Sequence, residues 1–178
     1  PRADKAKPTE GAGVRGLRAV ADGASIGDRE RDDAMSRWRL FYHLVWTTRD
    51  RQPFITPEWE ARVHARLREA AERHGIMVHA VGGTDDHVHL AVSIPPTLPV
   101  ATAIQRIKGA SSRMINEEFG DGFGWQAEYS VDSFAERHLP RVVAYIVDQR
   151  RHHAEGTLWP TIEELPRPQI PNASGRHR

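Results

Sequence analysis

The segment "TDDHVHLAVSI", residues 84–94, determines the fold expected for this chain. It reads as a β-strand, in which side chains alternate and residues two positions apart share a face. One face is apolar and comprises Val88, Leu90, Val92 and Ile94. The other face begins with two imidazoles, His87 and His89. We therefore expect the apolar face to pack against helices, and the two imidazoles to point together away from that core.

Further strands and helices are predicted on both sides of this segment. Aromatic and β-branched runs indicate strands over 38–48, 76–83, 87–94 and 127–135. Helical spacing of apolar residues, with Pro57 and Pro140 suited to a first turn, indicates helices over 57–75, 98–120 and 140–153. The order β-α-β-β-α-β-α predicts an α+β, ferredoxin-like βαββαβ fold with an added C-terminal helix. We expect a four-stranded antiparallel sheet with helices on one face and the other face free.

The chain divides into one domain and two tails. Residues 1–34 show no sustained hydrophobic periodicity and are expected to be a disordered tail. Residues 165–178 contain three prolines and are expected to be a second flexible tail. Residues 35–164 carry all the predicted strands and helices, so this range is the expected domain.

Composition excludes some classes of site and favours none. The chain has 178 residues and no cysteine, so disulfides and thiolate metal sites are excluded. No apolar run is long enough to span a membrane and no signal peptide is evident, so we expect no membrane association and a cytoplasmic location. The formal net charge is only +1, and any binding of nucleic acid must therefore use local patches.

The two imidazoles of the strand can form part of a metal site. Histidines at i and i+2 of a strand lie side by side, and neutral imidazole is a common ligand of divalent cations. His87 and His89 are therefore candidate metal ligands. The alternative, two hydrogen-bonded histidines without a metal, stays open at this point.

A tyrosine on the last predicted helix is the second candidate. Tyr145 and Gln149 are four residues apart, so they project from neighbouring turns of one helix face. A tyrosine hydroxyl can act as a covalent nucleophile, and a cation that polarises the electrophile assists it. Gln149 can complete a metal site with the two histidines. Tyr145 can equally be a boundary residue with its ring in the core, and Gln149 a solvated amide.

Together these motifs resemble the single-tyrosine HUH transposases, the small enzymes of the IS200/IS605 group and their REP-associated relatives. "FYHLVWTTRDRQPFI" is similar to the family's first strand and the loop after it, and "GGTDDHVHLAVSIPP" to its central hairpin. "IQRIKGASSRMI" resembles a helix of the family, "WQAEYSVDSF" the strand after it, and "YIVDQ" the segment around its tyrosine. The resemblance covers about residues 36–160.

The resemblance implies a DNA transposase that cleaves and rejoins single-stranded DNA next to hairpin ends. Tyr145 is then the nucleophile, which becomes joined to the 5′ phosphate and releases a 3′ hydroxyl. His87, His89 and Gln149 are then the ligands of Mg²⁺ or Mn²⁺. The family also implies a homodimer in which the last helix of one chain completes the site of the other.

Contacts to DNA are expected from a set of basic, hydroxyl and aromatic residues, which can bind phosphates or stack on unpaired bases. The set comprises Arg49, Arg51, Arg106, Lys108, Ser111, Ser112, Arg113, Arg150 and Trp125. Solvated charges, and core packing for Trp125, are the alternatives. Asp85 and Asp86 can orient an imidazole or serve only as turn residues.

Three functions remain open from the sequence. The first is an active transposase, and the second is a hairpin-binding protein of the same fold that does not cleave DNA. The third is a metal-free ferredoxin-like interaction domain. The presence of Tyr145, His87, His89 and Gln149 together favours the first, because a pure binding protein does not need all four.

Overall fold

A four-stranded antiparallel sheet in the order β2-β3-β1-β4 forms the centre of the molecule, as the ferredoxin-like prediction requires. The computed structural model describes residues 38–163. The strands are β1 (Phe41–Thr47), β2 (Met77–Gly83), β3 (His87–Ser93) and β4 (Ser130–Phe134). Each predicted strand is present and somewhat shorter than its sequence pattern.

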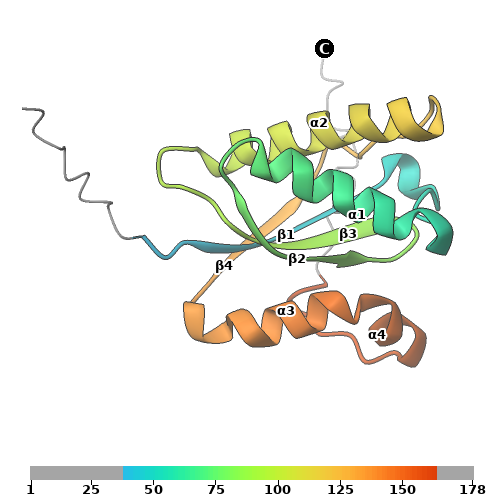
Figure 1. Ribbon diagram of the computed structural model, residues 1–178. Coiled ribbons are helices and arrows are strands. Elements are labelled where there is room, and N and C mark those ends of the chain that lie inside the picture. The colour runs from blue at the N-terminus through green and yellow to red at the C-terminus, as the bar shows by residue number, and fades with distance from the viewer. Residues whose placement is uncertain (1–37, 164–178) are drawn as a thin grey trace, which may run out of the picture. The chain divides into compact units, whose positions relative to one another are not determined.

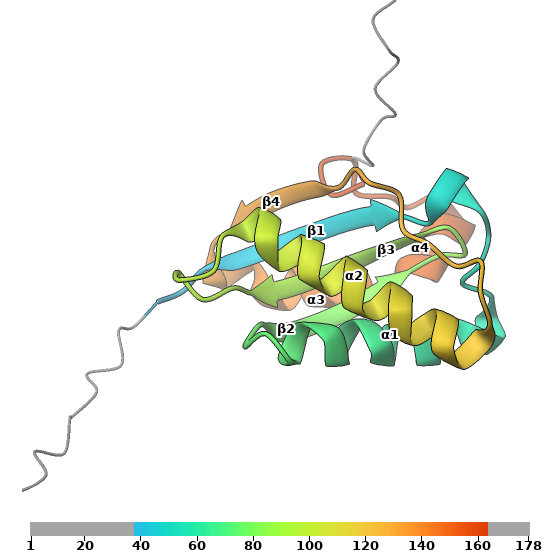
Figure 2. The ribbon, with the colours of Figure 1, turned by 90° about the horizontal axis from the view of Figure 1, so that it is seen from above.

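Helices cover both faces of this sheet. They are α1 (Pro57–Glu72), α2 (Val100–Phe119), α3 (Leu139–Val147) and α4 (Gln149–Glu155), with short 3-10 turns η1 (Arg49–Arg51) and η2 (Glu136–His138). In Figure 1, α1 and α2 lie above the sheet, whereas α3 and α4 lie below it. Figure 2 shows α1 and α2 in front of the strands, with α3 and α4 behind them. The prediction that one face of the sheet is free was therefore wrong.

The larger core lies between the sheet and the pair α1 and α2. Val88, Leu90 and Val92 of β3 point into it and are fully buried, as the alternation predicted. They pack with apolar residues of β1 and both helices, including Leu44, Trp46, Leu67, Ile104 and Ile115. Burial of this apolar surface is the main stabilising contribution to the sheet.

A second, smaller core explains why α3 covers the opposite face. It consists of Ala80, Ala91, Val142, Tyr145, Ile146 and Ile162. The small side chains of β2 and β3 allow the helix to lie close to the sheet, and the closest approach is at Gly82. A Cβ atom at Gly82 would lie only 1.8 Å from the carbonyl oxygen of Ile146. The glycine is therefore needed for this packing.

The last predicted helix is bent where a continuous helix over 140–153 was expected. Asp148 separates α3 from α4 and has φ −95° and ψ 16°, outside helical geometry. Beyond the bend, the Arg150 side chain donates hydrogen bonds to Glu60, Asp85 and the carbonyl of Ile55. These contacts hold α4 against α1 and the β2–β3 turn, which accounts for its change of direction.

The tails expected at 1–34 and 165–178 lie outside the described residues. Within residues 38–163, no helix has both the length and the apolar character needed to cross a membrane.

Candidate functional site

The two predicted imidazoles lie side by side on β3, beneath α3 and α4. His87 is 1% exposed and His89 is fully buried, and their ring centroids are 5.1 Å apart. Their side chains share the sheet face that carries the smaller core, as the alternation along the strand predicted. The burial arises because α3 and α4 cover this face.

Neighbouring groups hold His87 in one orientation. Its Nδ1 lies 2.7 Å from Asp86 Oδ1 and 2.8 Å from Thr84 Oγ1, and Arg51 binds the other oxygen of Asp86. The hydrogen bond with His87 keeps the pKa of the Asp86 carboxyl well below its ordinary value. An ionised Asp86 accepts the proton of Nδ1, which assigns the free lone pair of His87 to Nε2. Asp86 thus orients an imidazole, one of its two expected roles.

A third histidine holds His89. Nδ1 of His89 lies 2.9 Å from Nε2 of His43 on β1. Burial lowers the pKa of His43 to about 4 and the pKa of His89 well below its ordinary value. Both rings are therefore neutral at pH 7, which is the state in which imidazole binds metals. His43 was not predicted, although its position opposite Ala91 in the β1–β3 register places it on the same face.

Three buried side-chain nitrogen and oxygen atoms at this place have no hydrogen-bond partner among the described residues. They are His87 Nε2, His89 Nε2 and Gln149 Oε1. A buried polar atom without a partner destabilises a fold by about 1–3 kcal/mol, so a cation or a hydrogen-bonding group that binds these atoms would offset that cost. Two imidazoles and an amide oxygen are suitable ligands for a divalent cation such as Mg²⁺ or Mn²⁺. The side chains present therefore fit the predicted metal site.

Tyr145 and Gln149 converge on one carboxylate although the bend at Asp148 separates them. The hydroxyl of Tyr145 and Nε2 of Gln149, the latter at 2.8 Å, both donate to Oε1 of Glu163. The other oxygen of Glu163 lies 3.7 Å from Nε2 of His89. The phenol and the imidazole pair are thus linked through Glu163. Burial, together with the hydrogen bond to Glu163, raises the pKa of Tyr145 to about 12.

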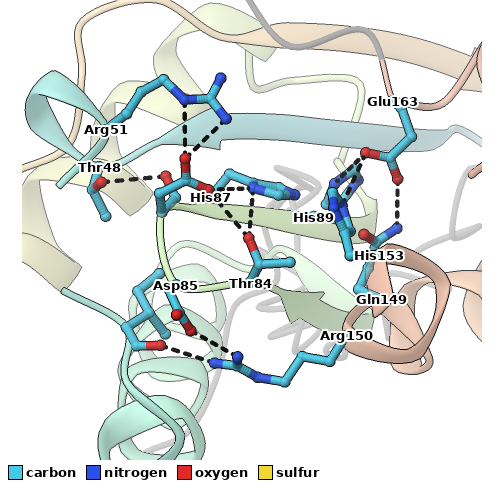
Figure 3. Close-up of polar contacts among 12 residues, drawn as sticks. Thr48, Arg51, Thr84, Asp85, His87, His89, Gln149, Arg150, His153 and Glu163 are labelled. Atoms are coloured by element: carbon cyan, nitrogen blue, oxygen red, sulfur yellow. Dashed lines mark hydrogen bonds and ion pairs between the residues drawn. The ribbon is translucent and has the colours of Figure 1, made fainter. Parts of the chain in front are cut away.

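Glu163 and His153 belong to the site and were not predicted as site residues. Nε2 of His153 lies 3.4 Å from Oε2 of Glu163, and Figure 3 shows both side chains beside His89 and Gln149. His153 is four residues after Gln149, so helical spacing was a usable signal for it. Glu163 lies outside the helices and strands, where no periodicity indicates which way a side chain points.

The residues expected to contact DNA separate into three groups. Arg49, Lys108, Ser112 and Trp125 line one open cavity of about 490 Å³ beside α2. Arg106 and Arg113 are exposed on the same helix. The third group consists of Arg51, Ser111 and Arg150, which form hydrogen bonds or ion pairs with other residues of the protein.

The residues of the third group already have partners within the protein. Ser111 is fully buried and accepts a hydrogen bond from the indole of Trp125. Arg51 is bound to Asp86, and the Arg150 guanidinium is occupied by Glu60, Asp85 and a backbone carbonyl. Figure 3 shows Arg150 reaching Asp85 at the turn before His87. Ser111, Arg51 and Arg150 therefore have structural roles, and their contact with DNA stays a prediction.

Lys108 and Trp125 also have structural roles. Nζ of Lys108 donates to three consecutive carbonyls, those of Gln126, Ala127 and Glu128. Trp125 is 9% exposed and packs edge-on against Trp46. The cavity wall is thus fixed by internal contacts.

The sequence model of the family described as "Transposase IS200 like" matches residues 36–149. The transposases of insertion sequence element IS200 from Salmonella typhimurium and Salmonella typhi are both 32% identical over 96 residues. That match covers 54% of this chain and 62% of each relative, so the chain spans less than two thirds of their length.

Two solved structures are similar to this chain to different degrees. A transposase candidate from Deinococcus radiodurans superposes with a TM-score of 0.52 at 26% identity, over 62% of this chain and 90% of the other. A REP-associated tyrosine transposase bound to a REP hairpin gives a TM-score of 0.49 at 15% identity, over 71% of this chain and 81% of the other.

Proposed function

Because this chain belongs to the family of IS200-like transposases, we propose that it cleaves and rejoins single-stranded DNA near hairpin ends through a 5′-phosphotyrosine intermediate. One observation carries the proposal. The hydroxyl of Tyr145 contacts the same carboxylate, that of Glu163, whose second oxygen lies 3.7 Å from His89. The proposed nucleophile, an acidic acceptor and the two proposed metal ligands are therefore adjacent within one chain.

Tyr145 is the proposed nucleophile. Its oxygen bonds to the scissile phosphorus while the bond from phosphorus to the 3′ oxygen breaks, and that oxygen leaves as a hydroxyl with a proton from solvent water. The phenolic proton passes to Glu163, which already accepts the hydrogen bond. Since the pKa of Tyr145 is raised to about 12, the phenol is protonated at pH 7 and needs such an acceptor.

His87, His89 and Gln149 are the proposed ligands of Mg²⁺ or Mn²⁺. Each has a buried acceptor atom without a partner among the described residues. A divalent cation here supplies polarisation of a phosphate oxygen. Asp86 and His43 hold the imidazoles so that both Nε2 atoms point into the site.

The cavity beside α2 is the proposed contact surface for the unpaired strand. Its wall combines the exposed ring of Tyr129 with the side chains of Arg49 and Ser112. Aromatic rings stack on bases of any sequence, and basic groups pair with phosphates. Arg106 and Arg113, on the same helix, extend the basic surface.

A homodimer also remains a proposal for this chain. Tyr145 reaches the imidazole pair of its own chain through Glu163, which favours a site assembled within one chain over an exchange of the last helix.

The test uses the full chain with Mg²⁺ or Mn²⁺ and a labelled single-stranded hairpin from the DNA that flanks its own gene. We expect a protein–DNA adduct that survives denaturation and is absent in Tyr145→Phe. Hairpin binding without any adduct would instead support the non-cleaving hairpin-binding protein. We also expect His87→Ala to reduce cleavage far more than binding.

A further inference from the structure

The carboxylate of Glu163 is surrounded by groups from three separate parts of the chain. One oxygen accepts hydrogen bonds from Tyr145 and Gln149. The other lies 3.7 Å from Nε2 of His89 on β3 and 3.4 Å from Nε2 of His153 on α4. The side chain of Glu163 is only 10% exposed.

Three of the ligand atoms here are close enough for one cation, and Nε2 of His89 lies 3.7 Å from the carboxylate of Glu163. One ligand atom each from His87, His153 and Glu163 lie within 4.8 Å of one another. Ligands on opposite sides of a cation are about 4 Å apart, since each bond is about 2.0–2.2 Å. Small side-chain rotations are therefore sufficient to place all three atoms around a single ion.

Independent contacts fix these side chains in place. The His153 ring lies 4.9 Å from the His87 ring, centroid to centroid. On the other side, the backbone N–H of Trp159 donates to the Tyr145 hydroxyl at 2.9 Å, and Ile162 is buried in the smaller core. Glu163 is therefore held at the imidazoles by packing of the residues just before it.

We propose that Glu163 and His153 are further ligands of the cation that His87, His89 and Gln149 hold, an inference that rests on the metal site of the proposed function. The carboxylate supplies a negative charge that the other ligands lack. The third imidazole shifts the preference of the site from Mg²⁺, which favours oxygen ligands, towards Mn²⁺. The bound cation also fastens the segment 159–163 to the sheet.

Binding of Mn²⁺ to the full chain without DNA tests this inference. Free Mn²⁺ is measured by electron paramagnetic resonance during a titration. We expect Glu163→Gln and His153→Ala each to weaken binding by about tenfold or more. His89→Ala is the reference for loss of a primary ligand, and His74→Ala, in the turn after α1, is the control that should bind as the wild type does. Mg²⁺ should displace Mn²⁺ only at large excess.

A second measurement separates ligation from loss of folding. The visible absorption of bound Co²⁺ reports the number and geometry of its ligands, so both variants should change that spectrum while their circular dichroism stays native. The inference would be overturned if both variants bound Mn²⁺ as the wild type does and left the Co²⁺ spectrum unchanged. If only one variant behaved in this way, its residue would not be a ligand. If instead the wild type binds no Mn²⁺, or His89→Ala binds normally, the metal site of the proposed function itself fails.

Discussion

The hydroxyl of Tyr145 donates a hydrogen bond to Glu163, 18 residues further along the chain. The same hydroxyl accepts a hydrogen bond from the backbone N–H of Trp159 at 2.9 Å. The proposed nucleophile is thus held from both sides by the short segment after α4. This relationship makes the segment part of the site and leads to the first prediction.

Glu163→Gln should lower the pKa of Tyr145 from about 12 towards its ordinary value of 10, because the negative charge of Glu163 is one cause of the increase. Ultraviolet absorbance of tyrosinate during a titration measures this change, with Tyr145→Phe subtracted to remove the other tyrosines. A titration identical to that of the wild type would mean that burial alone raises the pKa.

The same pKa shift affects stability at high pH. The folded-state pKa of Tyr145 is above the unfolded-state value, so the native state retains the proton more strongly. The resulting stabilisation is present in full below pH 10 and is lost as the pH rises from 10 through about 12. Urea unfolding across this range should show a smaller loss of stability in Tyr145→Phe than in the wild type.

Gly82→Ala should destabilise the packing of α3 on the sheet. The added Cβ would lie 1.8 Å from the carbonyl oxygen of Ile146, so the helix must move. We expect a loss of about 1–3 kcal/mol in the free energy of unfolding, together with reduced Mn²⁺ binding.

Gly109→Ala is the matched control, because no atom outside its own helix backbone and chain neighbours lies within 4 Å of its Cβ position. Alanine in the middle of α2 should stabilise the chain by about 0.5–1 kcal/mol. An equal effect of the two substitutions would contradict this account.

Arg150→Ala should lower stability by about 2 kcal/mol, because it removes charged hydrogen bonds that join α4 to α1 and to the β2–β3 turn. Its neighbour Arg151 provides the control, since it is exposed and, within residues 38–163, it pairs with the nearby Asp148. Arg151→Ala should have little effect on the same urea-unfolding curve. If Arg150→Ala unfolds as the wild type does but binds DNA more weakly, the structural role is contradicted and the predicted contact of Arg150 with a DNA phosphate is supported.

Arg49→Ala should weaken binding of single-stranded DNA and make it less dependent on salt. Among residues 38–163, the guanidinium of Arg49 has no acidic partner, and it lines the cavity beside α2. Removal of one phosphate contact should reduce the slope of log affinity against log salt by roughly 0.7. Arg73→Ala, which removes the same charge from a pair with Glu69, should leave the slope unchanged. Equal slopes for wild type and Arg49→Ala would exclude this contact.

The sheet and the imidazole pair could be predicted because they depend on local periodicity. Alternation along residues 87–93 places His87 and His89 together whatever covers them. The order of elements then restricts the topology to the ferredoxin-like arrangement. The family resemblance indicated Tyr145 and Gln149 as partners of the pair, and the structure brings them to the same place through Glu163.

The position of α3 and the role of Glu163 depend on tertiary contacts that periodicity does not encode. The apolar stripe of α3 fits either face of the sheet, and the small residues Ala80, Gly82 and Ala91 decide the face by allowing close approach. The bend at Asp148 follows from the distant partners of Arg150, on α1 and on the β2–β3 turn. Glu163 has no repeating neighbours, so only the folded chain indicates its direction.

Peptide mapping of the covalent adduct tests the central claim most directly. The full chain is incubated with Mn²⁺ and the single-stranded hairpin, denatured and digested with protease and nuclease, and the modified peptide is sequenced by mass spectrometry. We predict a nucleotide joined through its 5′ phosphate to Tyr145, and no modified peptide from Tyr145→Phe. Attachment at another residue, or cleaved DNA without any attached peptide, would contradict the account.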